Sequence, residues 1–397
     1  MKRFVFFVII AYSLCLMMGG CAVKMPPKFP LIKIPSAEYP NFYDDMAYDG
    51  LQQGISRSIE YLRKIPADRT FQFGEDKFNA EHIRRSLEYF LSFIAAKPPA
   101  RELRRFIQEN YAVYKSVGTG EESLPVLFTG YYEPLLQGSL YQSSEYRFPV
   151  YAPPDDMMSI DLSLFSEEFK GKKITGRLAD RTFVPYYERK EIEERNALEG
   201  KAEVIAWVND RTDLFFLQIQ GSGKIALDNG DIINVNYENQ NGRAYRSIGK
   251  LLIESGKISK EDMSMQKIRE YLREHPDEAG AILNYNPSYV FFSLGKEGPR
   301  GALNFPLTPG RSAAVDRSVF PMSALAYVET QKPLTDTSGK ITRWTDCTRF
   351  VLHQDTGGAI KGAGRMDLFW GSGDYAEIAA GHLRHRGNIY VLVLKRG

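Results

Sequence analysis

The sequence predicts a mainly β protein with flanking helices. Before residue 120, apolar side chains recur at one-turn spacing in three segments, which indicates amphipathic helices. From residue 126 onward, the apolar runs are short, rich in β-branched and aromatic residues, and separated by Gly, Pro and Asn, as is typical of strands and turns. The chain has 397 residues, more than one hydrophobic core usually organises, so about two domains are expected.

The three N-terminal helices are expected at residues 51–62, 83–94 and 100–111. The second ends before Lys97-Pro98-Pro99, because proline cannot continue a helix. A further helical pair is expected at residues 245–255 and 259–275. Strands are expected at residues 126–132, 147–151, 204–208, 214–220, 290–292 and 389–394.

The first twenty residues have the pattern of a secretory signal. Lys2-Arg3 precedes an apolar run that ends at Gly19-Gly20-Cys21, too short for a stable membrane span. Residues 16–21 resemble a bacterial lipobox, in which Cys21 receives a lipid and becomes the new N-terminus. A plain signal peptide with an incidental cysteine is the alternative. The absence of Asp after Cys21 indicates the periplasmic face of the outer membrane, and Pro- and Lys-rich residues 21–36 are expected to form a tether.

Composition narrows the function. A net charge of +2 gives no electrostatic basis for binding nucleic acid. Cys347 is the only cysteine after Cys21, so no intramolecular disulfide is expected. No Gly-x-Ser-x-Gly elbow, phosphate loop or dinucleotide fingerprint occurs. His382 and His385 are the only histidines at helical spacing and lack a third ligand nearby, so neither a metal nor an organic cofactor is expected.

Three aspartates in a Gly-rich, β-type setting are the strongest candidates for chemistry: Asp316, Asp355 and Asp367. Each also has a structural interpretation, since acidic residues near glycines often fix turns. Asp367 fits that interpretation least well, because Leu368-Phe369-Trp370 follows it and bulky apolar neighbours raise a carboxyl pKa by desolvation. A carboxyl that stays protonated near neutral pH is the central tool of glycosidic bond cleavage.

Long ordered strings of sequence carry a family resemblance. They are Phe128-Thr129-Gly130-Tyr131-Tyr132-Glu133-Pro134, Gln218-Ile219-Gln220-Gly221-Ser222-Gly223, residues 242–250, 261–266 and 286–292, Ala314-Val315-Asp316-Arg317-Ser318, residues 354–362 and Asp367-Leu368-Phe369-Trp370-Gly371. In this order they resemble the blocks of the membrane-bound lytic murein transglycosylase A family, including its C-terminal three-aspartate (3D) domain. The resemblance spans about residues 124–397.

The resemblance implies a six-stranded double-psi β-barrel and a smaller, inserted all-β domain, with a groove between them for a glycan strand. The barrel domain with its N-terminal helices would comprise residues 37–133 and 294–397, and the insert residues 134–293. The resemblance further implies cleavage of peptidoglycan between N-acetylmuramic acid and N-acetylglucosamine without water. Asp367 falls on the position of the family's catalytic aspartate, and Asp316 and Asp355 on positions that shape its environment.

Other residues of the family blocks are expected either to contact sugars or to shape loops and barrel ends: Thr129, Tyr132, Gln220, Ser222, Tyr245, Arg246 and Lys361. The expected partners are peptidoglycan strands, the membrane through Cys21, and complexes that build or degrade the cell wall.

One carboxyl suffices for the implied reaction, because muramic acid carries its own nucleophile, the C6 hydroxyl. Asp367 would act first as acid and then as base, which requires a pKa near the working pH. Two alternatives remain at this point. One is a conventional glycosidase that uses Asp367 with Asp355 or Asp316 and consumes water. The other is a non-catalytic envelope lipoprotein that binds glycan.

Overall fold

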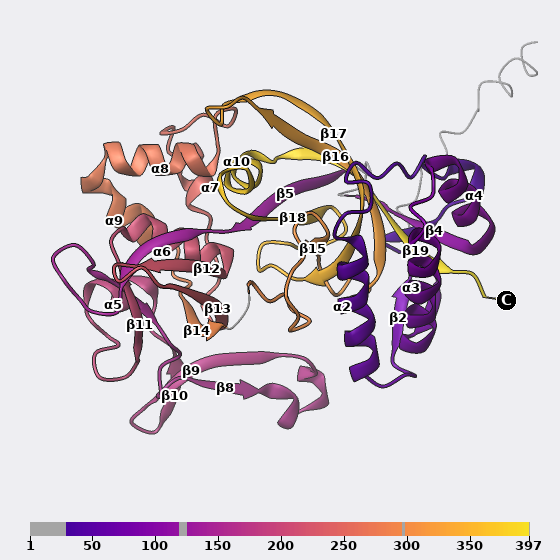
Figure 1. Cartoon of the computed structure of the whole chain (residues 1–397). Coiled ribbons are helices and arrows are strands. Elements are labelled where there is room, and N and C mark those ends of the chain that lie inside the picture. Colours follow the sequence, from indigo (N-terminus) through magenta and orange to yellow (C-terminus); the bar gives the residue numbers. More distant parts are fainter. Residues whose placement is uncertain (1–28, 119–124, 296–297, 397) are drawn as a thin grey trace, which may run out of the picture.

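The computed structural model describes residues 29–118, 125–295 and 298–396 (Figure 1). Its largest sheet contains β5 (Val126–Glu133), β15 (Ser312–Ala314), β16 (Leu325–Thr335), β17 (Ile341–Asp355), β18 (Arg365–Ser372) and β19 (His385–Leu394). These six strands form a closed barrel, because the order β19-β16-β17-β15-β18-β5 is completed by pairing of β5 with β19. The β15–β17 and β18–β5 pairs are parallel. The expected mainly β fold around a six-stranded barrel is confirmed.

Two further strands extend this sheet beyond β19. β4 (Tyr111–Ser116) pairs with β19, and β1 (Leu31–Lys33) pairs with β4, both antiparallel. Leu31 is buried in the main hydrophobic core. The prediction of a tether as far as residue 36 is therefore wrong for β1, because its backbone pairs in a sheet and its first side chain packs in the core.

Three helices pack on the barrel: α2 (Leu51–Lys64), α3 (Ala80–Ile94) and α4 (Ala100–Asn110). They contact β17, β19 and β4, respectively, through the apolar stripes that predicted them. Asn79 caps α3 by accepting a hydrogen bond from the His82 backbone N–H. A short hairpin of β2 (Thr70–Phe73) and β3 (Asp76–Asn79) connects α2 to α3.

A second group of strands follows β5, after Pro134. A six-stranded sheet has the order β14-β13-β12-β6-β11-β7, and a three-stranded sheet has the order β10-β9-β8. The strands are β6 (Leu135–Ser139), β7 (Phe148–Tyr151), β8 (Met158–Asp161), β9 (Lys173–Ala179), β10 (Thr182–Pro185), β11 (Val204–Val208), β12 (Ser222–Leu227), β13 (Ile232–Gln240) and β14 (Val290–Gly295). The domain boundaries expected from the sequence stay a prediction.

The same stretch of chain also contains helices. The helical pair expected at residues 245–255 and 259–275 is confirmed, whereas the all-β insert implied by the resemblance included no helix. They are α5 (Arg189–Glu194), α6 (Arg211–Gln220), α7 (Ile248–Glu254), α8 (Met265–Glu274) and α9 (Pro276–Asn284). The predicted strand at residues 214–220 is wrong, because this segment belongs to α6. Asp210 caps α6 by accepting hydrogen bonds from two backbone N–H groups, and Gly221 ends it at φ +79°. α10 (Asp374–His382) lies between β18 and β19.

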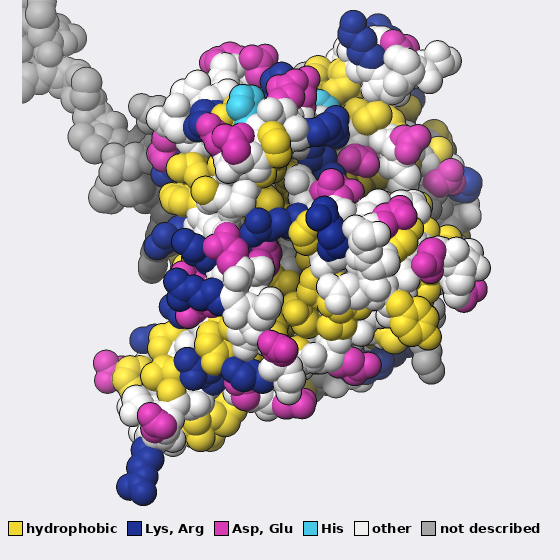
Figure 2. All heavy atoms as spheres, turned by 90° about the vertical axis from the view of Figure 1, so that its left-hand side faces the viewer, with side chains coloured by type: hydrophobic (Ala, Val, Ile, Leu, Met, Phe, Trp, Pro, Cys, Tyr) yellow, Lys and Arg dark blue, Asp and Glu magenta, His cyan; other side chains and the backbone are white. Residues whose placement is uncertain are grey.

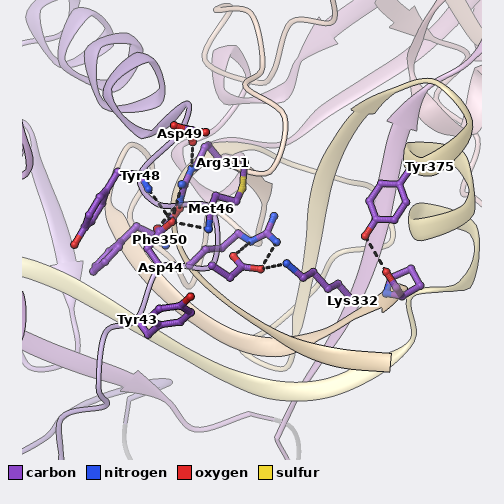
Figure 3. Close-up of polar contacts among 12 residues, drawn as sticks. Tyr43, Asp44, Met46, Tyr48, Asp49, Arg311, Lys332, Phe350 and Tyr375 are labelled. Carbon is purple, nitrogen blue, oxygen red and sulfur yellow. Dashed lines mark hydrogen bonds and ion pairs between the residues drawn. The ribbon is translucent and has the colours of Figure 1, made fainter. Parts of the chain in front are cut away.

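A buried ion pair attaches the segment before α2 to the barrel (Figure 3). The Arg311 guanidinium, directly before β15, contacts both carboxylate oxygens of Asp44 at 2.6 and 2.8 Å, and both side chains are almost fully buried. Arg311 also donates to the backbone carbonyl of Asp49 at 2.7 Å. Burial favours the neutral form of Asp44, but the hydrogen bonds and charge of Arg311 outweigh it and lower the pKa of Asp44.

Charges of both signs are mixed over the face shown in Figure 2, and hydrophobic side chains gather on the lobe at its lower edge. That lobe is the β8–β10 sheet, which lies lowest in Figure 1 as well. In the described ranges, no helix has the length and apolar character that crossing a membrane requires.

Candidate active site

Asp355 and Asp367 lie at the same level of the barrel, on the two strands that flank β15. Ala314 pairs with Asp355 of β17 on one side and with Asp367 of β18 on the other. Since neighbouring strands are about 4.8 Å apart, the two aspartate backbones are about 10 Å apart. At this separation the two side-chain carboxyls interact electrostatically. The third aspartate, Asp316, lies two residues after the end of β15.

The Asp367 carboxyl is largely withdrawn from water. Its side chain is 21% exposed, yet its Oδ1 atom is buried and accepts no hydrogen bond from the described residues. The nearest cation is the Arg365 guanidinium, whose Nη2 lies 3.9 Å from Oδ1. Burial raises the pKa of Asp367 to about 6; the positive charge of Arg365 opposes this shift, and the negative charge of Asp355 adds to it.

Asp355 is half-buried and has three hydrogen-bond donors. Its Oδ1 accepts from the backbone N–H groups of Ala302 and Thr356, and its Oδ2 accepts from the Tyr131 hydroxyl, each at 2.9 Å. Burial raises the pKa of Asp355 to about 6 in spite of these bonds, which favour the anion. Of the two coupled carboxyls, Asp355 is thus the better stabilised as a carboxylate, which favours the proton on Asp367.

Asp316 has a different environment. Its Oδ1 accepts from the backbone N–H and the hydroxyl of Ser318, at 2.9 and 2.6 Å, and its Oδ2 accepts from the Gly362 backbone N–H at 2.7 Å. Burial favours the neutral form, but these hydrogen bonds and the charge of Lys361 outweigh it and lower the pKa of Asp316. Asp316 therefore joins the turn after β15 to the loop before β18.

Thr129, Tyr131 and Arg365 complete the face around Asp367. Thr129 pairs with Asp367 across the parallel β5–β18 pair, and its hydroxyl accepts from Arg365 Nη2 at 3.2 Å. Because alternate residues of a strand point to the same face, Tyr131 lies on the Thr129 face and Arg365 on the Asp367 face. Thr129 was expected near the site; Tyr131 and Arg365 were not.

Tyr132 and Gln220, both predicted to contact substrate, take part in packing and hydrogen bonding between β5 and α6; the sugar contact of Gln220 stays a prediction. Tyr132 is 3% exposed and packs in a hydrophobic cluster with Phe215 and Ala376, so a direct contact with a sugar is wrong for this side chain. The Gln220 side-chain carbonyl accepts from the Tyr132 backbone N–H at 3.0 Å, which joins the end of α6 to β5.

The other expected contacts lie on β12, on loops or at the surface. Ser222 begins β12 and is 8% exposed. Tyr245, which is 42% exposed, and the exposed Arg246 lie between β13 and α7, and the Arg246 backbone N–H donates to Asn286 Oδ1. Lys361 is exposed in the loop that Asp316 contacts.

No group of three or more His, Cys, Asp or Glu residues among the described residues has the arrangement of a metal site. Cys21, the expected lipidation site, lies outside the described residues.

Two family models match the chain. The MltA specific insert domain matches residues 127–293, and the 3D domain matches residues 311–393. The second match contains all three aspartates of the candidate site.

Curated relatives match by sequence. Membrane-bound lytic murein transglycosylase A of Escherichia coli K12 is 36% identical over 270 residues, which cover 67% of this chain and 65% of that protein. The protein of the same name from Vibrio cholerae is 31% identical over 285 residues, covering 70% of this chain and 68% of that protein. The chain thus aligns with just under two thirds of the E. coli relative's length.

Solved structures match over nearly the whole chain. The membrane-bound lytic murein transglycosylase of Agrobacterium tumefaciens has a TM-score of 0.74 at 27% identity, covering 92% of this chain and 98% of that one. E. coli MltA with bound chitohexaose has a TM-score of 0.65 at 28% identity, covering 95% and 98%. With both family models and these relatives in agreement, this chain belongs to the membrane-bound lytic murein transglycosylase A family.

Proposed function

We propose that this protein is a lytic transglycosylase that cleaves the β-1,4 bond between N-acetylmuramic acid and N-acetylglucosamine in peptidoglycan, without consuming water. The observation that carries the proposal is the Asp367 carboxyl, whose Oδ1 is buried with no hydrogen-bond donor among the described residues and whose pKa is raised to about 6. The names of the relatives support the reaction class, and the chitohexaose bound to the E. coli relative supports a glycan substrate.

In the proposed reaction, Asp367 transfers one proton in each direction. Protonated Asp367 donates to the glycosidic oxygen as the bond between that oxygen and C1 of muramic acid breaks. The resulting carboxylate accepts the proton of the C6 hydroxyl as that oxygen bonds to C1. The products are a free sugar hydroxyl and a 1,6-anhydromuramic end, and Asp367 is protonated again. Because the nucleophile belongs to the same sugar, its attack avoids the entropy cost of bringing in a second reactant.

The residues around Asp367 set its pKa. The negative charge of Asp355 raises the Asp367 pKa, while hydrogen bonds from Tyr131 and two backbone N–H groups favour the Asp355 anion and oppose the burial that raises its own pKa. The positive charge of Arg365, which also donates a hydrogen bond to Thr129, limits the rise of the Asp367 pKa. The Asp367 pKa therefore stays in the pH range in which this carboxyl can both donate and accept a proton. Asp316 accepts a hydrogen bond from the Gly362 backbone N–H and so positions the loop before β18; its role at the site is structural.

A hydrolase with two working carboxyls is less well supported. In that mechanism the second carboxyl must attack C1 or activate a water molecule. Asp355 is the nearest candidate, but both of its oxygens already accept hydrogen bonds from Tyr131, Ala302 and Thr356. A carboxylate held in this way supplies charge to Asp367 rather than a base for water.

The remaining sequence predictions are retained as part of this proposal. Sugar contacts are proposed for Thr129, Gln220, Ser222, Tyr245, Arg246 and Lys361, of which the last three are exposed. A lipid on Cys21 would hold the protein at the periplasmic face of the outer membrane, and the relatives' names include the words membrane-bound. We also propose residues 134–293 as the inserted domain, and cell-wall complexes as protein partners.

Mass spectrometry of the muropeptides released from purified sacculi tests this function. A soluble form that starts after Cys21 should release fragments with anhydromuramic ends, and Asp367→Asn should reduce the release by about 10²–10⁴-fold. Asp346→Asn, an exposed aspartate of β17, is the matched control and should keep wild-type activity. Reducing muramic ends, heavier by one water, would identify a hydrolase instead. Binding of sacculi without any release by the wild type would identify a glycan-binding protein.

A further inference from the structure

The pairing of β15 with β17 is irregular next to the two buried aspartates. Ala313 pairs with His353. The next residue of β15, Ala314, pairs with Asp355, so Gln354 is skipped. Two residues of β17 therefore oppose one residue of β15, which is a β-bulge. Bulges are frequent next to active sites, where they change the direction in which a side chain points.

The bulge determines which side chain of β17 lies beside Asp367. Residues that pair directly across two strands point to the same face of the sheet, and Ala314 pairs with Asp367 on its other side. Regular pairing would place Gln354 opposite Ala314, and side-chain alternation would then turn Asp355 to the other face. With the bulge, Asp355 is opposite Ala314 and lies on the face of Asp367.

The side chain of Gln354 is 3% exposed, and its polar atoms have partners on two other elements. Its amide nitrogen donates to the Gly54 backbone carbonyl at 2.7 Å and to the Ser58 hydroxyl at 3.0 Å, both on α2. Its oxygen accepts from the Ser312 hydroxyl of β15 at 2.6 Å. Breaking such buried hydrogen bonds is costly, because the separated atoms have no water to bind. The extra residue of the bulge is thus fixed to both α2 and β15.

α2 packs closely along β17 (Figure 1). Gly54 faces the strand, since a Cβ atom there would lie 3.2 Å from Leu352 Cδ2. Arg57 donates to the hydroxyl of Thr308, a buried residue shortly before β15, at 2.7 Å. α2 lies outside both segments that match family models. A helix from outside the matched domains therefore supports the strand that carries Asp355.

We propose that Gln354 is a positioning residue for the reaction: its hydrogen bonds to α2 and β15 hold the bulge that brings the Asp355 charge beside Asp367. Gln354 does not act on the substrate itself but through Asp355. The expected effect on activity rests on the function proposed above. The placement of Asp355 does not, because it is a property of the fold.

The effect of Gln354 depends on the charges around the two aspartates. Apart from the aspartates, the titratable or charged side chains that act on the pair are Tyr131 of β5 and Arg365 of β18. If Gln354 loses its partners, the bulge relaxes toward regular pairing and the Asp355 carboxylate turns away from Asp367. Burial and, in addition, the negative charge of Asp355 raise the Asp367 pKa, so this pKa should fall.

The pH–rate profile on sacculi tests the proposal, with the soluble protein that starts after Cys21. Gln354→Met keeps the length of the side chain and removes its hydrogen bonds, and Ser58→Ala removes one of those bonds. We expect the alkaline limb to move to lower pH, by about one unit in Gln354→Met and by less in Ser58→Ala. Such a shift lowers the activity on the alkaline side about tenfold, because each pKa unit changes the protonated fraction there by that factor.

Ser86→Ala is the matched control for Ser58→Ala. Ser86 is a buried serine of α3, and its hydroxyl accepts from the Leu394 backbone N–H of β19 at 2.9 Å. Its loss weakens a contact between a helix and the barrel that involves neither aspartate strand, so the limb should stay in place. Arg343→Gln, at an exposed position of β17, should leave it in place as well. A limb that moves equally in both serine variants would show a general effect of stability and overturn the proposal.

Carboxyl-carbon NMR titration separates this inference from the proposed reaction, because it needs no turnover. In the wild-type background, Asp355→Asn should lower the titration midpoint of Asp367. In the Gln354→Met background, the same change should have less than about half of that effect, since the two carboxyls are no longer neighbours. Ser58→Ala serves as the second background if thermal unfolding shows that Gln354→Met does not fold.

The titrations decide whatever product the enzyme releases. Equal effects of Asp355→Asn in the wild-type and variant backgrounds would overturn the positioning role of Gln354. A reduced effect in the variant backgrounds supports that role, even if the sugars released from sacculi have reducing ends. Reducing ends would contradict the proposed reaction alone.

Discussion

The hydroxyl of Tyr131 donates a hydrogen bond to Asp355 at 2.9 Å, from the strand that also pairs with the strand of Asp367. This bond stabilises the Asp355 anion, and the Asp355 charge in turn raises the Asp367 pKa. The protonation of one aspartate therefore depends on a tyrosine that contacts the other.

Tyr131→Phe should lower the pKa that governs activity. Without the hydroxyl, the Asp355 pKa rises, Asp355 becomes neutral in mildly acidic solution, and its repulsion no longer favours the proton on Asp367. We expect the alkaline limb of the pH–rate profile to move to lower pH, with an activity loss of about tenfold near pH 6. Tyr375→Phe, which removes a hydroxyl bound to the Pro333 carbonyl on α10's side of the barrel, should leave the profile in place. An unchanged limb in Tyr131→Phe would contradict the role given to Asp355.

Arg365→Gln should shift the same limb in the opposite direction. The Arg365 charge lowers the Asp367 pKa, so its removal lets the pKa rise. Activity is then expected to persist to higher pH. The maximal rate should fall, because a protonated Asp367 with a higher pKa is a weaker acid. The pH dependence of kcat, compared with that of Arg343→Gln, measures the shift. A limb that moves to lower pH would show that Arg365 acts through structure and not through charge.

Asp367→Asn should stabilise the protein at alkaline pH. The folded-state pKa of about 6 lies above the unfolded value, so the favourable contribution of the protonated carboxyl is complete below about pH 4 and is lost as pH rises through 6. Above that pH, the wild type holds a poorly solvated carboxylate that the amide variant lacks. We expect a gain of about 1–3 kcal/mol in the free energy of unfolding at pH 8, and little gain at pH 4. Urea unfolding at both values measures it, and equal effects at the two would contradict the raised pKa.

Asp44→Asn should destabilise the fold by about 3–5 kcal/mol, because it leaves the Arg311 guanidinium buried without a counter-charge. The control is Asp49→Asn: Asp49 is highly exposed, lies 3.8 Å from the exposed Lys97, and such surface pairs contribute about 0–1 kcal/mol. Urea midpoints compare the two variants. Similar small losses in both would show that the Asp44–Arg311 pair does not hold the N-terminal segment on the barrel.

Local patterns predicted much of this fold, and the failures have physical causes. The apolar residues of α2, α3 and α4 recur at helical spacing because one face of each helix packs on the barrel, so these helices could be predicted. Residues 214–220 are rich in side chains that favour strands, yet they form a helix that begins at the Asp210 cap and ends at the left-handed Gly221. Both signals are present in the sequence, and they outweigh propensity.

The candidate site was also predicted only in part. Motif resemblance located the three aspartates, but not which of two adjacent tyrosines faces them. Tyr131 and Tyr132 differ only in strand register, which depends on the pairing of β5 with β18. Arg365 precedes Asp367 by two residues, a spacing that places both on one face once the segment is known to be a strand.

If Cys21 carries the proposed lipid, the pairing of β1 with β4 also limits how far the folded protein can lie from the membrane surface. With Cys21 acylated, the linker between the lipid and the sheet would be the chain from Cys21 to Leu31. Fully extended, this linker spans at most about 35 Å. Had residues 31–36 been free, the linker would reach roughly half as far again. A protein anchored in this proposed way would act on the layer of cell wall next to the membrane.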